Sequence, residues 1–174
     1  MRSTVDSLNL RTFMRELARL SRAEGRAYLT GGASAVLLGW RDMTMDVDIK
    51  IIPDSGPVLT AIRDLKESLN INVEFASPDD FIPELPGWRD RSRFIVREHA
   101  LDFYHYDFYA QCLSKIERGH RKDLADVKDM MADGLVEPVK LIELFERIEP
   151  ELLRYPAINA ADFRRAVETT IAPS

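Results

Sequence analysis

The 174-residue sequence has little of the chemistry that marks disulfide-stabilised or zinc-binding proteins. Its single cysteine, Cys112, excludes a disulfide framework and any cysteine-rich zinc site, and it fits a reducing compartment. We interpret Cys112 as a small buried apolar residue. The three histidines, His99, His105 and His120, show no metal-binding spacing. We interpret them as surface or hydrogen-bonded side chains, with His99 closing a hairpin.

Long apolar runs and internal repeats are also missing. No stretch approaches ~18 uninterrupted apolar residues, so no membrane span is expected. The first residues lack the apolar core of a signal peptide, and a cytoplasmic location is therefore expected. The absence of a repeat of ~20–50 residues excludes a solenoid. The net charge of −5 argues against a general basic surface for nucleic acid, although a local basic face stays open.

The spacing of apolar residues predicts one mixed domain over residues 1–174. Strands are expected at 27–30, 46–52, 72–75, 93–97 and 100–104, and helices at 7–24, 33–40, 59–69, 108–118, 122–131, 138–149 and 160–170. The strands gather in the first 105 residues and helices follow, which indicates an α/β (α+β) core with a helical C-terminal region at about 138–172. Residues 77–91, with three prolines and a glycine, predict a structured loop or flap.

The most informative stretch runs from residue 28 to residue 51. A Gly31-Gly32 turn follows a buried strand, and Asp46 and Asp48 then stand two residues apart on the next predicted strand, so both carboxylates point the same way. A hard divalent cation removes their mutual repulsion, and Mg²⁺ is usually held by one or two carboxylates plus substrate phosphates. Backbone N–H groups of the turn, with Ser34 behind it, can face phosphate oxygens. The alternative is an ordinary turn and an exposed polar strand face.

This segment resembles motif I of the DNA-polymerase-β-like nucleotidyltransferase superfamily, in which an apolar strand, Gly-Gly and a short helix precede Asp-x-Asp. The further match of Ser34, Arg41 and Thr44 is similar to the AbiEii-type nucleotidyltransferase-like proteins of prokaryotic toxin–antitoxin and phage-defence systems. A second stretch, 113–130, resembles the downstream helical motif of that family. Its matching positions are Lys115, Arg118, Lys122, Asp123 and Asp126. The resemblance covers about residues 25–133, with a C-terminal region shorter than in many relatives.

The resemblance implies a small mixed β-sheet flanked by helices, and metal-dependent transfer of a nucleoside monophosphate from an NTP with release of pyrophosphate. Asp46 and Asp48 would hold Mg²⁺ or Mn²⁺ against the triphosphate. Its phosphates would be contacted by Gly31, Gly32, Ser34, Lys115 and Arg118. The superfamily often adds a third carboxylate from a neighbouring strand, and Asp102 fits that place as metal ligand and general base. The alternative for Asp102 is a strand residue that faces solvent.

The helical motif has two interpretations as well. Lys115 would neutralise phosphate charge, while Asp123, and more weakly Asp126, would orient the acceptor or bind Lys115. A solvated ion-pair network of these residues would give the same pattern.

Aromatic residues outside the two motifs allow a nucleic-acid contact or simple packing. Trp88, within a basic stretch, would either stack on a base or anchor the loop. The cluster of Tyr104, Tyr106, Phe108 and Tyr109 is interpreted as packing rather than as a base-stacking platform.

Three functions follow as hypotheses. The first is a Mg²⁺-dependent nucleotidyltransferase of the toxin–antitoxin type that modifies RNA (tRNA in some relatives) or a protein hydroxyl. The second is a catalytically weak or inactive protein of the same fold that acts by binding a cognate toxin, antitoxin or other partner. The third is a sugar- or drug-modifying transferase, which the acidic loop around Asp79, Asp80 and Glu84 leaves open. Apolar faces of the two terminal helices would allow a homodimer.

Overall fold

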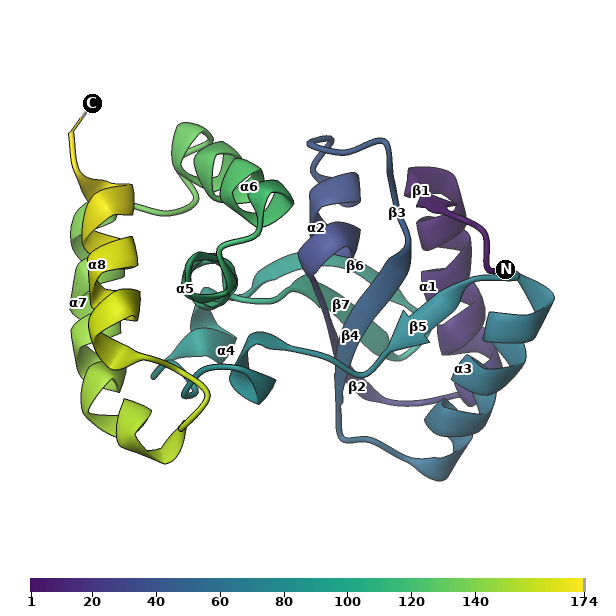
Figure 1. Ribbon diagram of the computed structural model, residues 1–174. Helices are drawn as coiled ribbons and strands as arrows, with labels where there is room; N and C mark the ends of the chain where they lie inside the picture. The colour runs from purple at the N-terminus through teal and green to yellow at the C-terminus, as the bar shows by residue number, and fades with distance from the viewer. Residues whose placement is uncertain (174) are drawn as a thin grey trace. The chain divides into compact units, whose positions relative to one another are not determined.

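A computed structural model describes residues 1–173, and the chain divides into two compact units (Figure 1). The first unit is built from Met1–Ser77 and Ser92–Tyr106, and the second from Pro78–Arg91 and the chain from Asp107 onward. The mixed α/β class expected from the sequence is confirmed. The single domain expected over residues 1–174 stays a prediction.

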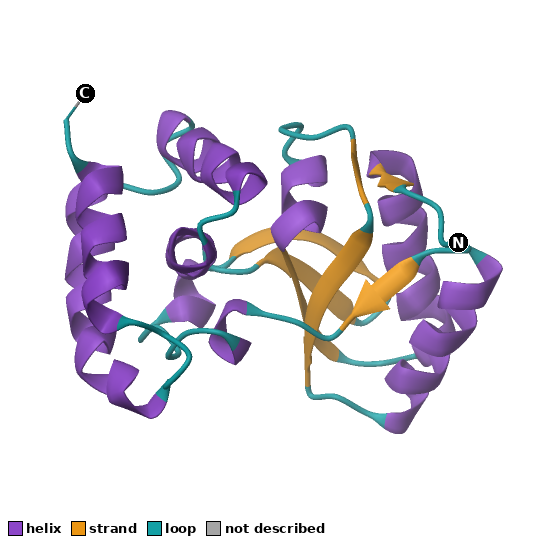
Figure 2. Ribbon diagram, in the orientation of Figure 1, coloured by secondary structure: helices purple, strands orange, loops and turns teal. Residues whose placement is uncertain are grey.

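A mixed five-stranded sheet forms the centre of the first unit, with the strand order β5-β4-β2-β7-β6 (Figure 2). Its strands are β2 (Gly25–Thr30), β4 (Asp46–Ile52), β5 (Asn72–Glu74), β6 (Arg93–Glu98) and β7 (Leu101–His105). Strand β2 runs antiparallel to β4 and parallel to β7, and β5 runs parallel to β4. Strands β6 and β7 form the expected hairpin, in which His99 takes a positive φ of 52°.

Helices α1 (Ser7–Ser21) and α3 (Gly56–Ser68) cover one face of this sheet, and α2 (Gly31–Leu37) follows β2 directly. The apolar stripe of α1, which includes Phe13 and Leu17, packs with Val47 and Ile49 of β4 in one core. Because successive strand residues point to opposite faces, this burial sends the residues between them to the other face of the sheet. The alternation of β4 in the sequence therefore predicted its two faces correctly.

A second, two-stranded sheet was missed by the sequence analysis. Strand β1 (Val5–Asp6) pairs with β3 (Met43–Thr44), where a polar connection was expected. A strand of two residues is too short to show a periodicity in the sequence. The two strands also lie almost forty residues apart in the chain, so no local sequence pattern predicts their pairing.

The second unit is helical. It contains α4 (Trp88–Arg91), α5 (Phe108–Arg118), α6 (Arg121–Ala132), α7 (Pro138–Ile148) and α8 (Ala160–Ile171), with short 3₁₀ helices at Pro78–Asp80 and Glu149–Arg154. The four longer helices confirm those predicted from spacing. Within residues 1–173, no helix is long and apolar enough to span a membrane.

Candidate functional site

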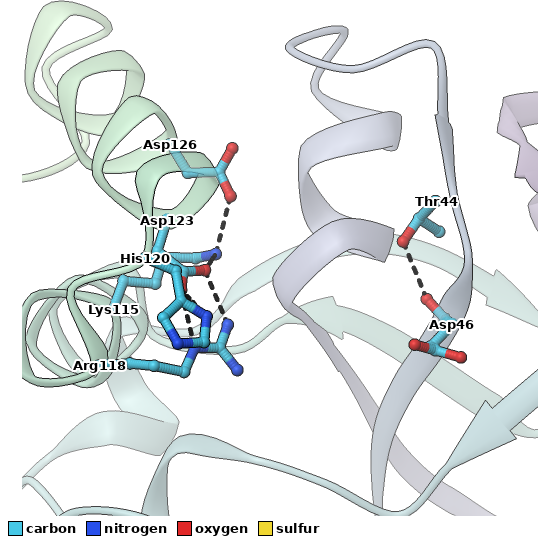
Figure 3. A network of polar contacts seen from close by, with 7 residues as sticks. All are labelled: Thr44, Asp46, Lys115, Arg118, His120, Asp123 and Asp126. Atoms are coloured by element: carbon cyan, nitrogen blue, oxygen red, sulfur yellow. Dashed lines mark hydrogen bonds and ion pairs between the residues drawn. The ribbon is translucent and has the colours of Figure 1, made fainter.

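Asp46 and Asp48 lie side by side on the sheet face opposite α1 and α3. Both carboxylates are half-buried, because Val47 and Ile49 on either side of Asp48 are fully buried in the core. Asn72 Nδ2 donates to Asp46 Oδ1 at 2.8 Å, and the Thr44 hydroxyl donates to the Asp46 carbonyl oxygen at 3.1 Å (Figure 3). The start of β4 is therefore held in place by β3 and β5.

Gly31 and Gly32, which were expected to form a turn before a helix at 33–40, are the first two residues of α2 and lie close to this acidic strand. Gly31 has a φ of +60°, and a Cβ added there would lie 3.0 Å from Asp48 Oδ2. A Cβ added at Gly32 would lie 2.1 Å from the Thr44 hydroxyl oxygen. Gly31 thus allows a close approach of backbone to the Asp48 carboxylate, and Gly32 allows a close approach to the Thr44 hydroxyl, that a side chain would hinder. The structure brings together the turn and the Asp pair, as the sequence analysis expected.

Ser34 lies beneath the turn rather than on its surface. Its side chain is buried, and its hydroxyl donates to the Leu29 carbonyl oxygen at 3.1 Å and lies 2.9 Å from His105 Nδ1. Burial, reinforced by the positive charge of Arg93, lowers the pKa of His105 to about 4. The structure therefore places the Ser34 hydroxyl in an internal hydrogen bond, where the sequence analysis expected a phosphate contact.

The structure places Asp102 away from the Asp pair. Asp102 on β7 is the register partner of Arg26, whereas Asp48 on β4 is the partner of Thr30. These two positions on β2 are four residues apart, which corresponds to about 13 Å along the strand. Arg97 Nη1 lies 3.4 Å from an Asp102 carboxylate oxygen. Asp102 is a partly exposed residue in an ion pair, and the expected triad of Asp46, Asp48 and Asp102 is not assembled.

The neighbouring carboxylate is instead Glu74, which the sequence analysis overlooked. Strand β5 runs parallel to β4 with Glu74 as the register partner of Asp48 and Asn72 as that of Asp46. Asn72 Nδ2 also donates to Glu74 Oε1 at 2.9 Å, so one amide contacts both carboxylates. Within residues 1–173 no three acidic, histidine or cysteine side chains already converge as metal ligands. Two strand carboxylates with a third beside them nevertheless suit Mg²⁺, which takes much of its coordination from phosphates and water.

The second motif forms a buried ion cluster within the helical unit. Lys115 Nζ of α5 donates to Asp126 Oδ2 at 2.7 Å and to Asp123 Oδ1 at 3.3 Å, both on α6 (Figure 3). Arg118 clamps Asp123 with two hydrogen bonds of 2.7 Å. Lys115, Asp123 and Asp126 are each at most 5% exposed, while the Arg118 side chain is 53% exposed. The cluster has two cations and two anions and is close to neutral.

The electrostatics of Asp123 follow from this cluster. Burial raises the pKa of Asp123, but the hydrogen bonds and charge of Arg118 together with the charge of Lys115 outweigh it, and the pKa lies below its ordinary value. The expected pairing of Lys115 with Asp123 is present, and Asp126 makes the shorter contact. The alternative of a solvated network is wrong, since three of the four groups are buried.

Comparison of the sequence with models of known protein families assigns the chain to a family. A family model described as "Nucleotidyltransferase of unknown function (DUF6036)" matches residues 8–170. The chain belongs to this nucleotidyltransferase family. The match confirms the prediction of a nucleotidyltransferase family and spans both helical and strand regions. No curated protein and no solved structure matches the chain.

Other residues singled out in the sequence have structural roles. Trp88 is buried and packs within the helical unit, so the loop-anchor interpretation is correct and base stacking by Trp88 is not. Arg91 Nη2 lies 2.7 Å from Asp107 Oδ2, and Asp107 caps α5 by accepting from the Tyr109 N–H group. Burial raises the pKa of Cys112 to about 12, as expected for an inert core thiol.

Gly32→Ala tests the close packing of Gly32 against Thr44. The added methyl group collides with Thr44, so β3 or the turn must move, and we expect destabilisation of about 1–3 kcal/mol. Binding of Mg²⁺–NTP should weaken in parallel. Gly56→Ala is the matched control, because a Cβ there meets no atom within 4 Å and the residue lies at the start of α3. Thermal denaturation and NTP titration of both variants measure the difference, and equal behaviour would contradict the packing argument.

Proposed function

We propose that this protein transfers a nucleoside monophosphate from an NTP to an acceptor hydroxyl and releases pyrophosphate. The observation that carries the proposal is the close fit of Gly31 beside the Asp48 carboxylate on the Asp-x-Asp strand, where an added Cβ would lie only 3.0 Å from Asp48 Oδ2. That arrangement lets a triphosphate lie against backbone N–H groups and the metal-binding carboxylates at once. Membership of a nucleotidyltransferase family supports the same chemistry.

Asp46, Asp48 and Glu74 are the residues that would hold Mg²⁺ or Mn²⁺. When bound, the metal would neutralise charge on the triphosphate and align the attacking and leaving oxygens. Asn72 orients Asp46 and Glu74 through its amide. The acceptor oxygen forms the new bond to the α-phosphorus, the bond to the β-phosphate oxygen breaks, and pyrophosphate leaves. Glu74, which is exposed on the same sheet face, takes the proton of the acceptor hydroxyl and replaces Asp102 in that role.

The Lys115 cluster divides into a positioning and a binding part. Lys115 is balanced by Asp123 and Asp126, so its charge serves to hold α5 against α6. Arg118 donates two hydrogen bonds to Asp123, but its side chain is half exposed. It is therefore the member of the cluster best suited to contact phosphate oxygens. Asp123 therefore acts as a positioning residue for both cations.

The biological setting proposed here is that of the AbiEii-type proteins, with an RNA or protein acceptor in a toxin–antitoxin or defence system. The support is the motif match of Gly31, Gly32, Ser34, Arg41 and Thr44 with the Asp pair. A cytoplasmic location with access to NTPs belongs to the same proposal. A partner-binding role without catalysis has less support, because the three carboxylates at the sheet edge are all present.

The experiment that tests the proposal follows the fate of the label on the NTP. The protein is incubated with Mg²⁺, a cell extract and each NTP labelled at either the α- or the γ-phosphate. Nucleotidyl transfer predicts that the α-label appears on an RNA or protein acceptor and that the γ-label does not. Labelling is compared with that of the extract alone, and the Asp46→Asn/Asp48→Asn variant should add no labelled acceptor to this background. Transfer of the γ-label above the background would show phosphoryl transfer instead and would contradict the proposal.

A further inference from the structure

A row of aromatic side chains crosses the sheet on the face that carries Asp46 and Asp48. Tyr28 of β2 is the register partner of Tyr104 of β7, which is in turn the partner of Phe94 of β6. The Tyr28 and Tyr104 rings stack at 5.5 Å between centroids, and Phe94 meets Tyr104 edge-to-face at 5.7 Å. We call Tyr28, Tyr104 and Phe94 the aromatic row. Tyr104 thus packs against its neighbours, as the sequence predicted, and it also borders the exposed Phe94.

The outer end of the aromatic row is open and bordered by arginines. Phe94 is 59% exposed, so much of its ring is accessible to a ligand. Tyr28 is buried and stacks on the Tyr104 ring. The Arg26 guanidinium lies 5.2 Å from the centre of the Tyr104 ring. Arg97, with 61% of its side chain exposed, stands beside Asp102 in the next row of the sheet. One carboxylate thus partly offsets two guanidinium groups, and a local positive charge remains on a chain of net charge −5.

We propose that this face binds a single-stranded nucleic acid, with bases stacked on Phe94 and Tyr104 and phosphates contacted by Arg26 and Arg97. The inference rests on the proposed function, because the bound strand is the acceptor of the nucleotidyl group. Aromatic rings on a sheet with flanking cations are the means by which proteins hold unpaired bases. The acceptor class is therefore single-stranded RNA or DNA, and not a protein hydroxyl.

Distances on the sheet separate this surface from the site of the NTP itself. Tyr104 is two strands and two residues away from Asp48, which corresponds to about 12 Å, and Phe94 is one strand further, at about 16 Å. A single nucleotide bound by the Asp pair does not reach from its α-phosphate to Phe94. A strand of several nucleotides does, with its end at the carboxylates. A duplex would keep its bases stacked inside and could not use the rings.

The test measures binding of RNA without any NTP. Fluorescence anisotropy with a labelled single-stranded RNA of about 12 nucleotides compares wild type with Phe94→Ala, for which loss of one stacked base predicts roughly ten-fold weaker binding. Phe94→Trp keeps a stacking surface and should bind as tightly as wild type. Phe75→Ala is the matched control, because Phe75 is 50% exposed and lines a groove with Leu59 and Ile62 of α3 on the other side of the sheet. It should bind RNA like wild type.

Two readouts keep this inference distinct from the proposed function. Mg²⁺–NTP binding, measured by thermal shift, should be normal in Phe94→Ala and lost in Asp46→Asn/Asp48→Asn, which should still bind RNA. If wild type binds RNA through Phe94 but no NTP, the proposed transfer fails and the RNA surface stands. If wild type binds no RNA, or Phe94→Ala and Phe75→Ala bind it equally, the inference is overturned. A protein would then be the acceptor to test next.

Discussion

Replacement of Lys115 with methionine is expected to lower the free energy of unfolding by about 3–5 kcal/mol. Lys115 is 5% exposed, and its ammonium contacts Asp126 at 2.7 Å and Asp123 at 3.3 Å. Methionine fills a similar volume but removes the cation that contacts both of these nearly buried carboxylates. Burying an ionised group without a close opposite charge is among the costliest changes a fold can suffer.

Urea denaturation of a Trp40→Phe background, followed through the fluorescence of the buried Trp88, measures this loss in the helical unit. Lys128→Met is the matched control, because Lys128 lies on α6 but is exposed, and its midpoint should stay close to that of wild type. Lys115→Met/Asp126→Leu removes one anion together with the cation and should recover most of the stability. A loss for Lys115→Met no larger than for Lys128→Met would show that the cluster is solvated, contrary to the structure. The double variant also lets NTP binding be tested without the stability defect.

Acidification between pH 6.5 and about 4 is expected to destabilise the strand-containing unit through His105. Burial, with help from Arg93, lowers the pKa of folded His105 to about 4, whereas the unfolded chain takes up its proton near 6.5. Above pH 6.5 both states are neutral at this residue, and stability is independent of its titration. Below that pH the unfolded state binds more protons, so the free energy of unfolding falls. The total loss is about 3 kcal/mol by the time pH reaches the folded pKa.

His105→Asn should flatten this part of the pH profile. Asn keeps a polar group for the Ser34 hydroxyl but does not titrate. His120→Asn is the control, because the His120 side chain is 72% exposed, and it should keep the wild-type slope. The lowered pKa of Asp123 acts at more acidic values, below its ordinary 3.8, and so outside this window. Parallel profiles for wild type and His105→Asn from pH 7.5 to 4.5 would contradict the assignment.

The sequence predicted local structure better than it predicted neighbours. Strand 46–52 and helix 108–118 have the bounds that were expected. Each is predicted by the apolar pattern of one continuous segment, which alternates in the strand and has helical spacing in the helix. The same runs placed both aspartates on one face of β4 and both glycines directly after β2, where the structure begins α2. These are properties of a single segment and of its direct successor.

The third carboxylate shows that the sequence pattern does not predict which strands are neighbours in the sheet. Asp102 and Glu74 both stand on predicted strands between apolar residues, and nothing in either segment says which strand pairs with β4. The pairing of Glu74 with Asp48 is a matter of register between segments far apart in the chain. The burial of Ser34 and of Lys115 is of the same kind, since it depends on what packs over them. Sequence patterns alone favour the surface for both residue types.

The central claim is that Asp46, Asp48 and Glu74 bind an NTP together with a divalent metal. Its most direct test is a thermal-shift titration of wild type with each of the four NTPs, with and without Mg²⁺, because a ligand that binds only the folded state raises the apparent stability. The account predicts stabilisation that needs both Mg²⁺ and NTP, is lost in Asp46→Asn/Asp48→Asn, is weakened in Glu74→Gln and is retained in Asp102→Asn. Mg²⁺-dependent stabilisation that survives in Asp46→Asn/Asp48→Asn, or no stabilisation of wild type by any NTP, would contradict it.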